Sequence, residues 1–377
     1  MENYIGPSIT LDFVKRANRS LVLELIKNDY PISRAQIARE LGLSKPTVSS
    51  IVNELLQKSL IVDLGEQPPE KGAGRPAHML GFNPCSAYAL SISMDGSETL
   101  ILTTDLLGKV LREKSIPNTN KLDDLIHEID CYIEESGLAQ QIISAMGMSI
   151  PGTVSEDGVV LHSGTLNWHS YDVLSILKKH YSFPIFLFND ANCALLGERW
   201  QGSGENSDDI FYISIGTGIG GAIISGGHIL NGYQSLAAEI CYQIGTDDIY
   251  KKRFNVLGQT GVFEQKVSTR YLSSGGYDYQ EVVPAYSAGD VSARGIIDSF
   301  ILELSVVIAN AIGFVNPEKV IIGGPFAEYM QPILPEIQRT VDALSPIHAD
   351  ICLASLGKYA SALGAIAYAF QQIEQND

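Results

Sequence analysis

Residues 33–56 read SRAQIARELGLSKPTVSSIVNELL, and this stretch determines how the start of the chain is expected to fold. Apolar residues recur at helical spacing on both sides of Gly42, which predicts two helices joined by a tight turn. Gly42 can adopt the positive φ of such a turn without steric cost. Ser44 stands at the N-cap position of the second helix, and Pro46 is tolerated in its first turn. The pattern is that of a helix-turn-helix.

The second of these helices divides into an apolar and a polar side. Val48, Ile51, Val52 and Leu55 fall on one face, which leaves short polar side chains and one cation on the other. Such side chains suit hydrogen bonding in the major groove of DNA. The residues predicted to contact DNA here are Arg34, Ser44, Lys45, Thr47, Ser49, Ser50 and Asn53. A plain helical hairpin is the alternative, because helix pairs with a glycine turn are common.

A wing is expected after the helix pair. Apolar runs at 60–62 and 78–82 flank a loop at 66–76 that is rich in proline, glycine and charge, which predicts strand, loop and strand. Arg75 in this loop is predicted to enter an adjacent minor groove, where negative potential attracts arginine.

An amphipathic helix is expected ahead of the pair, at about residues 11–27, with Leu21 and Ile26 facing inward. Together these elements predict a DNA-binding domain at residues 1–82.

Composition favours an ordinary globular protein with more than one domain. The 377 residues are 45% hydrophobic and carry a net charge of −17. The five cysteines include no C-x-x-C pair, so neither a disulfide framework nor a clustered zinc site is indicated. The start of the chain lacks the apolar core of a signal peptide, and the apolar stretch at 300–315 is too short to span a bilayer. We expect a cytoplasmic protein without a membrane segment.

The negative charge is unevenly distributed. Residues 1–80 contain 10 Lys and Arg and 9 Asp and Glu, whereas the remainder contains 16 and 34. The first part can therefore approach phosphate, while the acidic remainder would be repelled by it.

Residues after 82 alternate between strand-like and helical runs, which predicts an α/β architecture. The strand-like runs are 88–94, 100–104, 145–150, 185–188, 210–215, 221–225 and 320–322. The helical runs are 122–136, 171–180, 191–201, 291–314, 326–342 and 360–372.

Seven motifs in this part of the chain resemble, in order, those of the ROK family of bacterial repressors, sugar kinases and relatives. They are SIPGTV (149–154), FNDANCALLGE (188–198), IGTGIGGA (215–222), LAAEI (236–240), GQTGVFE (258–264), VIIGGP (320–325) and LGKYASALGA (356–365). The resemblance implies a two-lobed actin-like (ribonuclease H-like, sugar-kinase) fold with a sugar site between the lobes. The lobes are expected at 83–189 and 190–377, with the C-terminal helix returning to the first.

Asn189 and Asp190 end a strand and precede a helix, a common place for a ligand site in α/β sheets. A carboxylate there can accept a hydrogen bond from a sugar hydroxyl, although from the residues alone Asp190 could equally cap the helix. The resemblance favours the ligand role and adds further positions. The residues predicted to bind sugar are Gly152, Asn189, Asp190, Glu239, Tyr242 and Glu264.

The chain departs from the family at its usual zinc site. Members usually place a histidine at the position of Tyr242 and cysteines at those of Asn255, Leu257 and Val262. None of these four residues is a suitable zinc ligand here. We therefore predict no structural zinc and no cofactor, and expect Cys241 to be a small buried residue.

A second departure concerns ATP. Family kinases carry an Asp-x-Gly-x-Thr loop on the first strand, and residues 93–97 stand in its place, with Ser93 for the aspartate and Asp95 for the glycine. An added carboxylate would repel the phosphates of a nucleotide. Phosphoryl transfer from ATP needs a positioned phosphate as well as a base, so a base at Asp190 is not sufficient. We therefore predict no catalytic residues and no kinase activity.

The sequence thus predicts a sugar-responsive transcriptional repressor of carbohydrate-utilisation genes. A homodimer or tetramer would bind operator DNA, and a small-molecule sugar inducer would alter operator affinity. The alternative is an ATP-dependent ROK sugar kinase with a fused DNA-binding domain.

Overall fold

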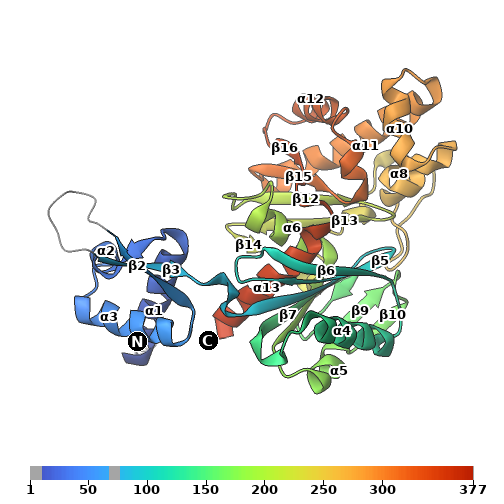
Figure 1. Cartoon of the computed structure of the whole chain (residues 1–377). Coiled ribbons are helices and arrows are strands. Elements are labelled where there is room, and N and C mark those ends of the chain that lie inside the picture. The colour runs from blue at the N-terminus through green and yellow to red at the C-terminus, as the bar shows by residue number, and fades with distance from the viewer. Residues whose placement is uncertain (1–10, 68–76, 377) are drawn as a thin grey trace, which may run out of the picture. The chain divides into compact units, whose positions relative to one another are not determined.

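The computed structural model describes residues 11–67 and 77–376 (Figure 1). The chain divides into two compact units. One unit comprises the residues up to Ala87 together with Asp105–Leu107, and the other comprises Tyr88–Thr104 and the residues from Gly108 onward.

The N-terminal unit has the elements of a winged helix-turn-helix. They are α1 (Leu11–Asn28), β1 (Ile32–Ser33), α2 (Arg34–Glu40), α3 (Lys45–Gln57), β2 (Ile61–Gln67) and β3 (Ala77–Phe82). The strands form an antiparallel sheet in the order β1-β3-β2. β2 and β3 are the two sides of the predicted wing, and its tip with Arg75 lies outside the described residues.

The helix-turn-helix forms because its sequence supplies a cap or turn residue at each boundary. Ser33 caps α2, and Gln36 completes a capping box with it. Gly42 lies at φ +63° in the turn, and the Ser44 hydroxyl accepts from the N–H of Thr47 at the start of α3. The predicted turn and cap are confirmed; the capping box was readable as S-x-x-Q but did not enter the prediction.

The inward face of α1 differs by one position from the prediction. Ile26 is fully buried as expected, but Leu21 is 47% exposed, and Val22 takes its place in the core. The core of this unit also includes Ile37, Val48, Val52, Leu55, Ile61 and Leu80.

The first sheet of the larger unit has the strand order β11-β7-β4-β5-β6. Its strands are β4 (Tyr88–Met94), β5 (Glu98–Thr104), β6 (Val110–Pro117), β7 (Ile143–Ile150) and β11 (Ile185–Asn189). β4, β7 and β11 are parallel, so their carboxyl ends meet at one edge. Helices α4 (Leu122–Ser136) and α5 (Val173–His180) cover one face, beside a small antiparallel sheet of β8 (Thr153–Val154), β9 (Val160–Ser163) and β10 (Trp168–Tyr171).

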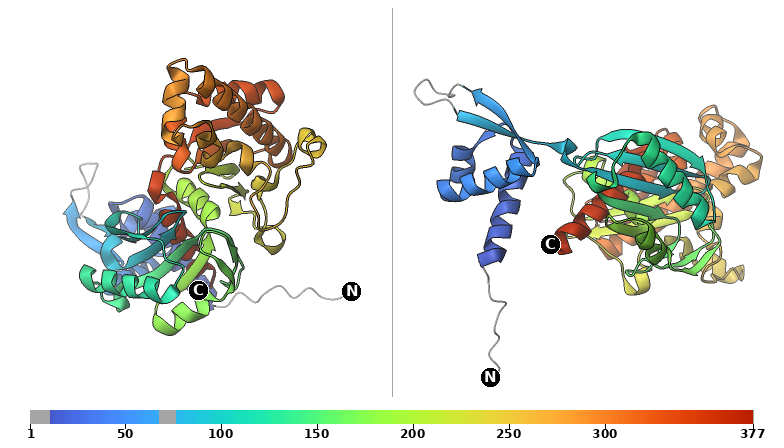
Figure 2. Two further views of the ribbon diagram at one scale, coloured as in Figure 1. Left: turned by 90° about the vertical axis from the view of Figure 1, so that its right-hand side faces the viewer. Right: turned by 60° about the horizontal axis from the view of Figure 1, so that its bottom comes forward.

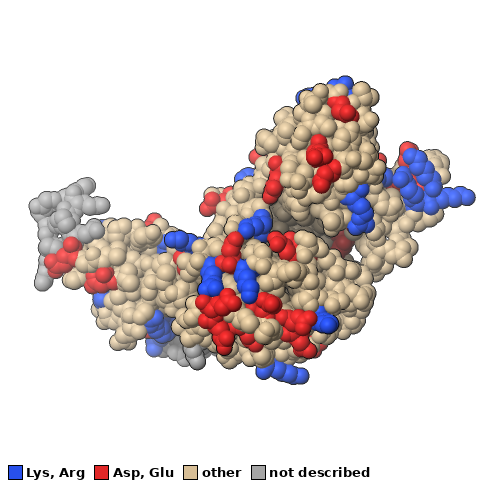
Figure 3. Space-filling view, turned by 45° about the vertical axis from the view of Figure 1, so that its right-hand side comes forward, with Lys and Arg blue, Asp and Glu red and all other residues tan. Residues whose placement is uncertain are grey.

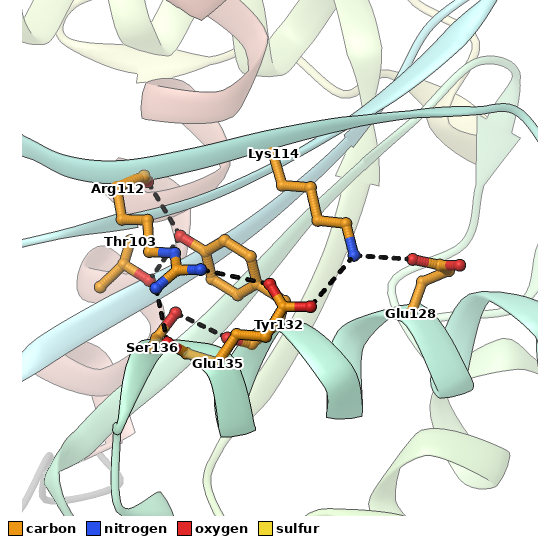
Figure 4. Close-up of polar contacts among 7 residues, drawn as sticks. All are labelled: Thr103, Arg112, Lys114, Glu128, Tyr132, Glu135 and Ser136. Carbon is orange, nitrogen blue, oxygen red and sulfur yellow. Dashed lines mark hydrogen bonds and ion pairs between the residues drawn. The ribbon is translucent and has the colours of Figure 1, made fainter.

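Helix α4 is tied to β6 by polar contacts along its length (Figure 4). The buried Tyr132 hydroxyl donates to the carbonyl of Arg112 at 2.9 Å, and the Arg112 guanidinium pairs with Glu135 at 3.2 Å. Lys114 pairs with Glu128 at 3.0 Å. The outer side of α4 remains strongly acidic (Figure 3), so this face of the body would repel a phosphate backbone.

The second sheet has the order β14-β13-β12-β15-β16. Its strands are β12 (Ile210–Ile215), β13 (Ile219–Ser225), β14 (His228–Ile229), β15 (Lys319–Gly323) and β16 (Asp350–Leu353). The helices that follow β11 are α6 (Asp190–Gln201), α7 (Thr246–Tyr250), α8 (Glu264–Val267), α9 (Thr269–Leu272), α10 (Tyr279–Ser287), α11 (Val291–Val315), α12 (Leu334–Leu344) and α13 (Ala360–Asn376) (Figure 2).

The expected helix at 326–342 is wrong as a single element. A 3₁₀ turn at Pro325–Tyr329 is followed by a break, and α12 begins only at Leu334. Pro332 falls inside the break, where a helix would need its N–H.

Helix α11 buries one face in the second core through Ile297, Phe300, Leu304 and Ile308. By length and composition alone it could cross a membrane. The core helix of a folded domain passes the same test, and the burial of this face is that of a core helix.

Helices α6 and α13 cross at glycines. A Cβ at Gly364 would lie 1.6 Å from the carbonyl oxygen of Cys193, and one at Gly197 would lie 2.1 Å from that of Ala360. α13 also packs on the first sheet, where Gly147 admits the backbone of Ala365. The start of α6, which carries Asp190, is therefore fixed against the C-terminal helix. The lobe boundaries at 83–189 and 190–377 stay predictions.

Candidate DNA-binding surface and candidate sugar site

The predicted DNA-contacting residues lie on and beside α3. Ser44, Lys45, Ser50 and Asn53 are exposed, whereas Arg34, Thr47 and Ser49 are half-buried. The hydroxyls of Ser44 and Thr47 are 2.7 Å apart, and that of Ser44 also caps the helix. These two side chains are therefore partly occupied within the protein. Lys45 and Ser50 are exposed, and Asn53 is exposed but its side-chain oxygen accepts a hydrogen bond from Arg34.

Arg34 of α2 is oriented across the start of this surface. Its guanidinium donates to the Asn53 side-chain oxygen at 2.9 Å. On the neighbouring sheet, Asp63 of β2 accepts from the N–H of Gly65 and pairs with His78 of β3 at 3.0 Å. These contacts hold the pKa of Asp63 below its usual range. The hydrogen bond to Asn53 thus links α2 to the predicted DNA-contacting face of α3.

Three of the predicted sugar-binding residues meet at the carboxyl edge of the first sheet. Asn189 ends β11 and caps α6 by accepting from the N–H of Asn192 at 3.0 Å. Its amide nitrogen donates to the carbonyl of Gly152 at 2.8 Å and to the Asp190 carboxylate at 2.9 Å. Asn189 is therefore the helix cap, which leaves Asp190 outside the capping role that was its alternative.

Two further predicted sugar-binding carboxylates, Glu239 and Glu264, lie in the same region, because, beyond the effect of burial, the charge of Glu239 raises the pKa of both Asp190 and Glu264. Burial raises the pKa of Asp190 to about 6, and the charge of Glu239 adds to the effect. Burial also raises the pKa of Glu239, and it raises that of Glu264 against the opposing charge of Arg270. Such a cluster offers several acceptors to the hydroxyls of a polyol.

The glycine-rich turn at 216–218 packs against Glu264. A Cβ at Gly218 would lie 3.5 Å from the Glu264 carboxylate. The carbonyl of Gly216 accepts from the N–H of Thr269, and that of Thr217 accepts from the guanidinium of Arg270. The turn is thus held by protein groups on the side that faces α8 and α9.

Tyr242 and Asn255, at two of the positions where the family usually has zinc ligands, are hydrogen-bonded within the protein. The Tyr242 hydroxyl accepts from the N–H of Gly258 at 2.9 Å. Asn255 donates to the Tyr242 carbonyl, and its side-chain oxygen accepts from the N–H of Val262 at 2.8 Å. Sequence reasoning missed this role of Asn255, because partners 13 and 7 residues away leave no local pattern.

Leu257 is 74% exposed and Cys241 is buried, its thiol 3.5 Å from Glu239. Within residues 11–67 and 77–376, no three His, Cys, Asp or Glu side chains are grouped to hold a metal ion. The absence of zinc stays a prediction.

The turn that stands in place of the family's phosphate loop is closed on itself. The Asp95 carboxylate accepts from the N–H of Ser97 at 2.8 Å and of Glu98 at 2.9 Å. Ser93 is buried, and a Cβ at Gly96 would lie 3.4 Å from the hydroxyl of Thr217. The Asp95 carboxylate therefore occupies two backbone N–H groups of this turn.

His162 lies on β9 and Trp168 lies on β10. Trp168 is buried and donates to the carbonyl of Asn120 at 2.7 Å, so it serves packing. The Nδ1 atoms of His162 and His169 are 3.1 Å apart.

Two family models match this chain. That of the ROK family matches residues 89–372, and one described as a winged helix-turn-helix DNA-binding model matches residues 16–62. The chain is 28% identical to the xylose repressor of Bacillus subtilis, over 93% of this chain and 94% of that protein. It is 26% identical to the glucokinase of Halalkalibacterium halodurans, over 74% of this chain and 93% of that protein.

A similar solved structure is that of a ROK family transcriptional regulator described as a homologue of the E. coli MLC protein. The TM-score is 0.79 at 24% identity, over 94% of this chain and 96% of that one. The matches confirm the predicted fold class, a winged helix-turn-helix followed by an α/β body of the actin-like sugar-kinase type.

Proposed function

This chain belongs to the ROK family and carries a winged helix-turn-helix ahead of the ROK body, and from that premise we propose that it is a sugar-responsive transcriptional repressor. A sugar binds at Gly152, Asn189, Asp190, Glu239, Tyr242 and Glu264, between the two sheets of the body. The sugar lowers operator affinity to the extent that it binds the DNA-incompetent state more tightly.

The observation that carries this proposal is the coexistence of two surfaces in one chain. Lys45, Ser50 and Asn53 are exposed along α3, and in the body the charge of Glu239 acts on the carboxylates of both Asp190 and Glu264. A xylose repressor resembles the chain over nearly its whole length, so xylose is the first inducer to test. The protein would act in the cytoplasm, where operator DNA is found.

The protein would bind its operator as a homodimer or tetramer, since two recognition helices can then contact two half-sites. The body is a sensor without kinase activity. Support comes from Asp95, whose carboxylate occupies the N–H groups of the turn at 95–98.

A gel-shift assay with the DNA upstream of the gene tests the proposal. We expect a sequence-specific complex that D-xylose or a related sugar dissociates, and that Asn53→Ala weakens about tenfold or more by removing a base-reading amide. Lys27→Ala, which removes a cation from the far end of α1, is the matched control. A protein that shifts no upstream DNA at low salt would contradict the proposal.

An ATP-dependent sugar kinase remains the second candidate, because burial raises the pKa of Asp190 to about 6, a value suited to a general base. A glucokinase also matches the body. A coupled ADP-release assay over the same sugars discriminates the two. Turnover that is abolished by Asp190→Asn would establish the kinase.

A further inference from the structure

Asn255 joins the two segments that carry the glutamates of the candidate sugar site. Tyr242 lies three residues after Glu239, and Val262 lies two residues before Glu264. The Asn255 amide donates to the carbonyl of Tyr242 at 2.5 Å and accepts from the N–H of Val262 at 2.8 Å. We call this pair of bonds the Asn255 clamp. One half-buried side chain thus spans both segments.

The clamped segments also approach through their backbones. The N–H of Phe263 donates to the carbonyl of Cys241 at 3.2 Å. A Cβ at Gly261 would lie 2.0 Å from that same carbonyl oxygen, so only glycine allows this spacing. Without the amide of Asn255, the carbonyl of Tyr242 and the N–H of Val262 would each lose a partner, which is costly for half-buried or buried groups.

The loop that carries Asn255 also binds the side chain of Tyr242. Its hydroxyl accepts from the N–H of Gly258, which leaves the phenolic proton free to be donated. Burial raises the pKa of Tyr242, and the charges of Glu239 and Glu264 add to the effect, so the phenol is protonated at neutral pH. Beside carboxylates, which only accept when they are ionised, it supplies a donor.

The loop between the segments has a second anchor at its base. Asp248 on α7 is fully buried and pairs with Lys266 at 2.8 Å and with Arg253 at 2.6 Å. Lys266 lies on α8, two residues after Glu264. The loop is therefore fixed to the segment of Glu264 through both Asp248 and Asn255. Asn255 also ties the loop to the segment of Glu239, through its bond to the Tyr242 carbonyl.

We propose that Asn255 is a positioning residue for sugar recognition: its clamp sets the separation of Glu239 and Glu264 and fixes the backbone of Tyr242. Tyr242 in turn selects among sugars by presenting a hydroxyl donor to the site. The inference rests on the proposed function and deepens it, because it names the residues that determine affinity and selectivity.

Calorimetric titration of the purified full chain with D-xylose, D-glucose and N-acetylglucosamine tests the inference apart from DNA. Asn255→Asp keeps the shape but cannot donate to the Tyr242 carbonyl. We expect about a tenfold to a hundredfold weaker Kd for the sugar that binds wild type most tightly, because a polar group is left without its partner. Operator affinity without sugar should stay within about twofold of wild type.

Leu257→Ala is the matched control, since this exposed side chain lies two residues away in the same loop. It should leave the Kd unchanged. Asn255→Gln, which keeps both amide ends on a longer stem, should bind sugar more tightly than Asn255→Asp.

Tyr242→Phe gives an independent check that does not disturb the clamp. It should change the ranking of the three sugars while operator affinity stays at the wild-type value. The inference is overturned if Asn255→Asp binds sugar as wild type does, or if Tyr242→Phe leaves both Kd and ranking unchanged. A wild-type protein that binds none of the sugars would contradict the proposed function itself.

Discussion

The predicted sugar site and the turn that stands in place of the phosphate loop differ in the hydrogen bonds that their polar groups make within the protein. At the carboxyl edge of the first sheet, the Asn189 amide donates to the Asp190 carboxylate and to the Gly152 carbonyl. At the turn after β4, Asp95 closes the backbone N–H groups on itself. The first region has the carboxylate of Asp190 as an acceptor for a ligand. In the second region, the N–H groups of Ser97 and Glu98 already donate to Asp95.

Under the proposed function, recognition of a sugar and transfer of a phosphate are separable in one fold. Polyol binding needs carboxylates and amides at fixed positions, and those persist through Asn189, Glu239 and Glu264. Phosphoryl transfer also needs free N–H groups and a positioned metal at the nucleotide. A regulator can lose the second set and still respond to the ligand of the first.

The largest effect is expected from Asp190→Asn. The substitution removes an ionised hydrogen-bond acceptor, and hydrogen bonds to charged groups are the stronger class. The sugar concentration needed to release operator DNA should therefore rise about a hundredfold. Operator affinity without sugar should be unchanged. A gel shift with a sugar titration measures both, and a variant that responds at the wild-type sugar concentration would remove Asp190 from the site.

The same substitution should stabilise the fold. The pKa of Asp190 is raised to about 6 in the folded protein, against an ordinary value of about 3.9, so the folded state binds the proton more tightly and loses stability as pH rises through this interval. Asp190→Asn should therefore gain roughly 2–3 kcal/mol at pH 7 and little at pH 4. Thermal unfolding at the two pH values checks this, and equal gains at both would count against the raised pKa.

Asp95→Gly restores the family residue at the closed turn and should lower stability by about 1 kcal/mol, because two N–H groups lose their acceptor. It should not create ATP turnover, since Ser93 still stands where family kinases have an aspartate. Urea unfolding and an ADP-release assay measure the two effects. Sugar-dependent ADP release by this single variant would show that the turn alone blocks catalysis.

The smallest effect is expected from metal removal. The Asn255 clamp holds the segments of Glu239 and Glu264 without a metal. Prolonged chelation should therefore leave the sugar concentration that releases half of the operator DNA within about twofold of its value before chelation. Metal analysis of the chelated protein supplies the control. A midpoint that rises on chelation and recovers with Zn²⁺ would refute the prediction of a zinc-free site.

The sequence was sufficient for the features that depend on local chemistry. Gly42 and Ser44 mark the turn and cap of the helix-turn-helix, and the strand before Asn189 ends where the pattern predicted. The sequence was insufficient for features that depend on contacts between residues far apart in the chain. The Asn255 clamp and the crossing of α6 and α13 at Gly364 depend on contacts that no periodicity encodes, and Leu21 was misplaced because adjacent apolar residues compete for one helix face.

Under the proposed function, the body binds a sugar without phosphorylating it, and the bound sugar changes the operator affinity of the winged helix-turn-helix. Fluorescence anisotropy of labelled upstream DNA, titrated with D-xylose and related sugars in the absence of nucleotide, tests it most directly. We predict that sugar alone releases the DNA from wild type and not from Asp190→Asn. Release that requires ATP, or binding that no sugar alters, would contradict the claim.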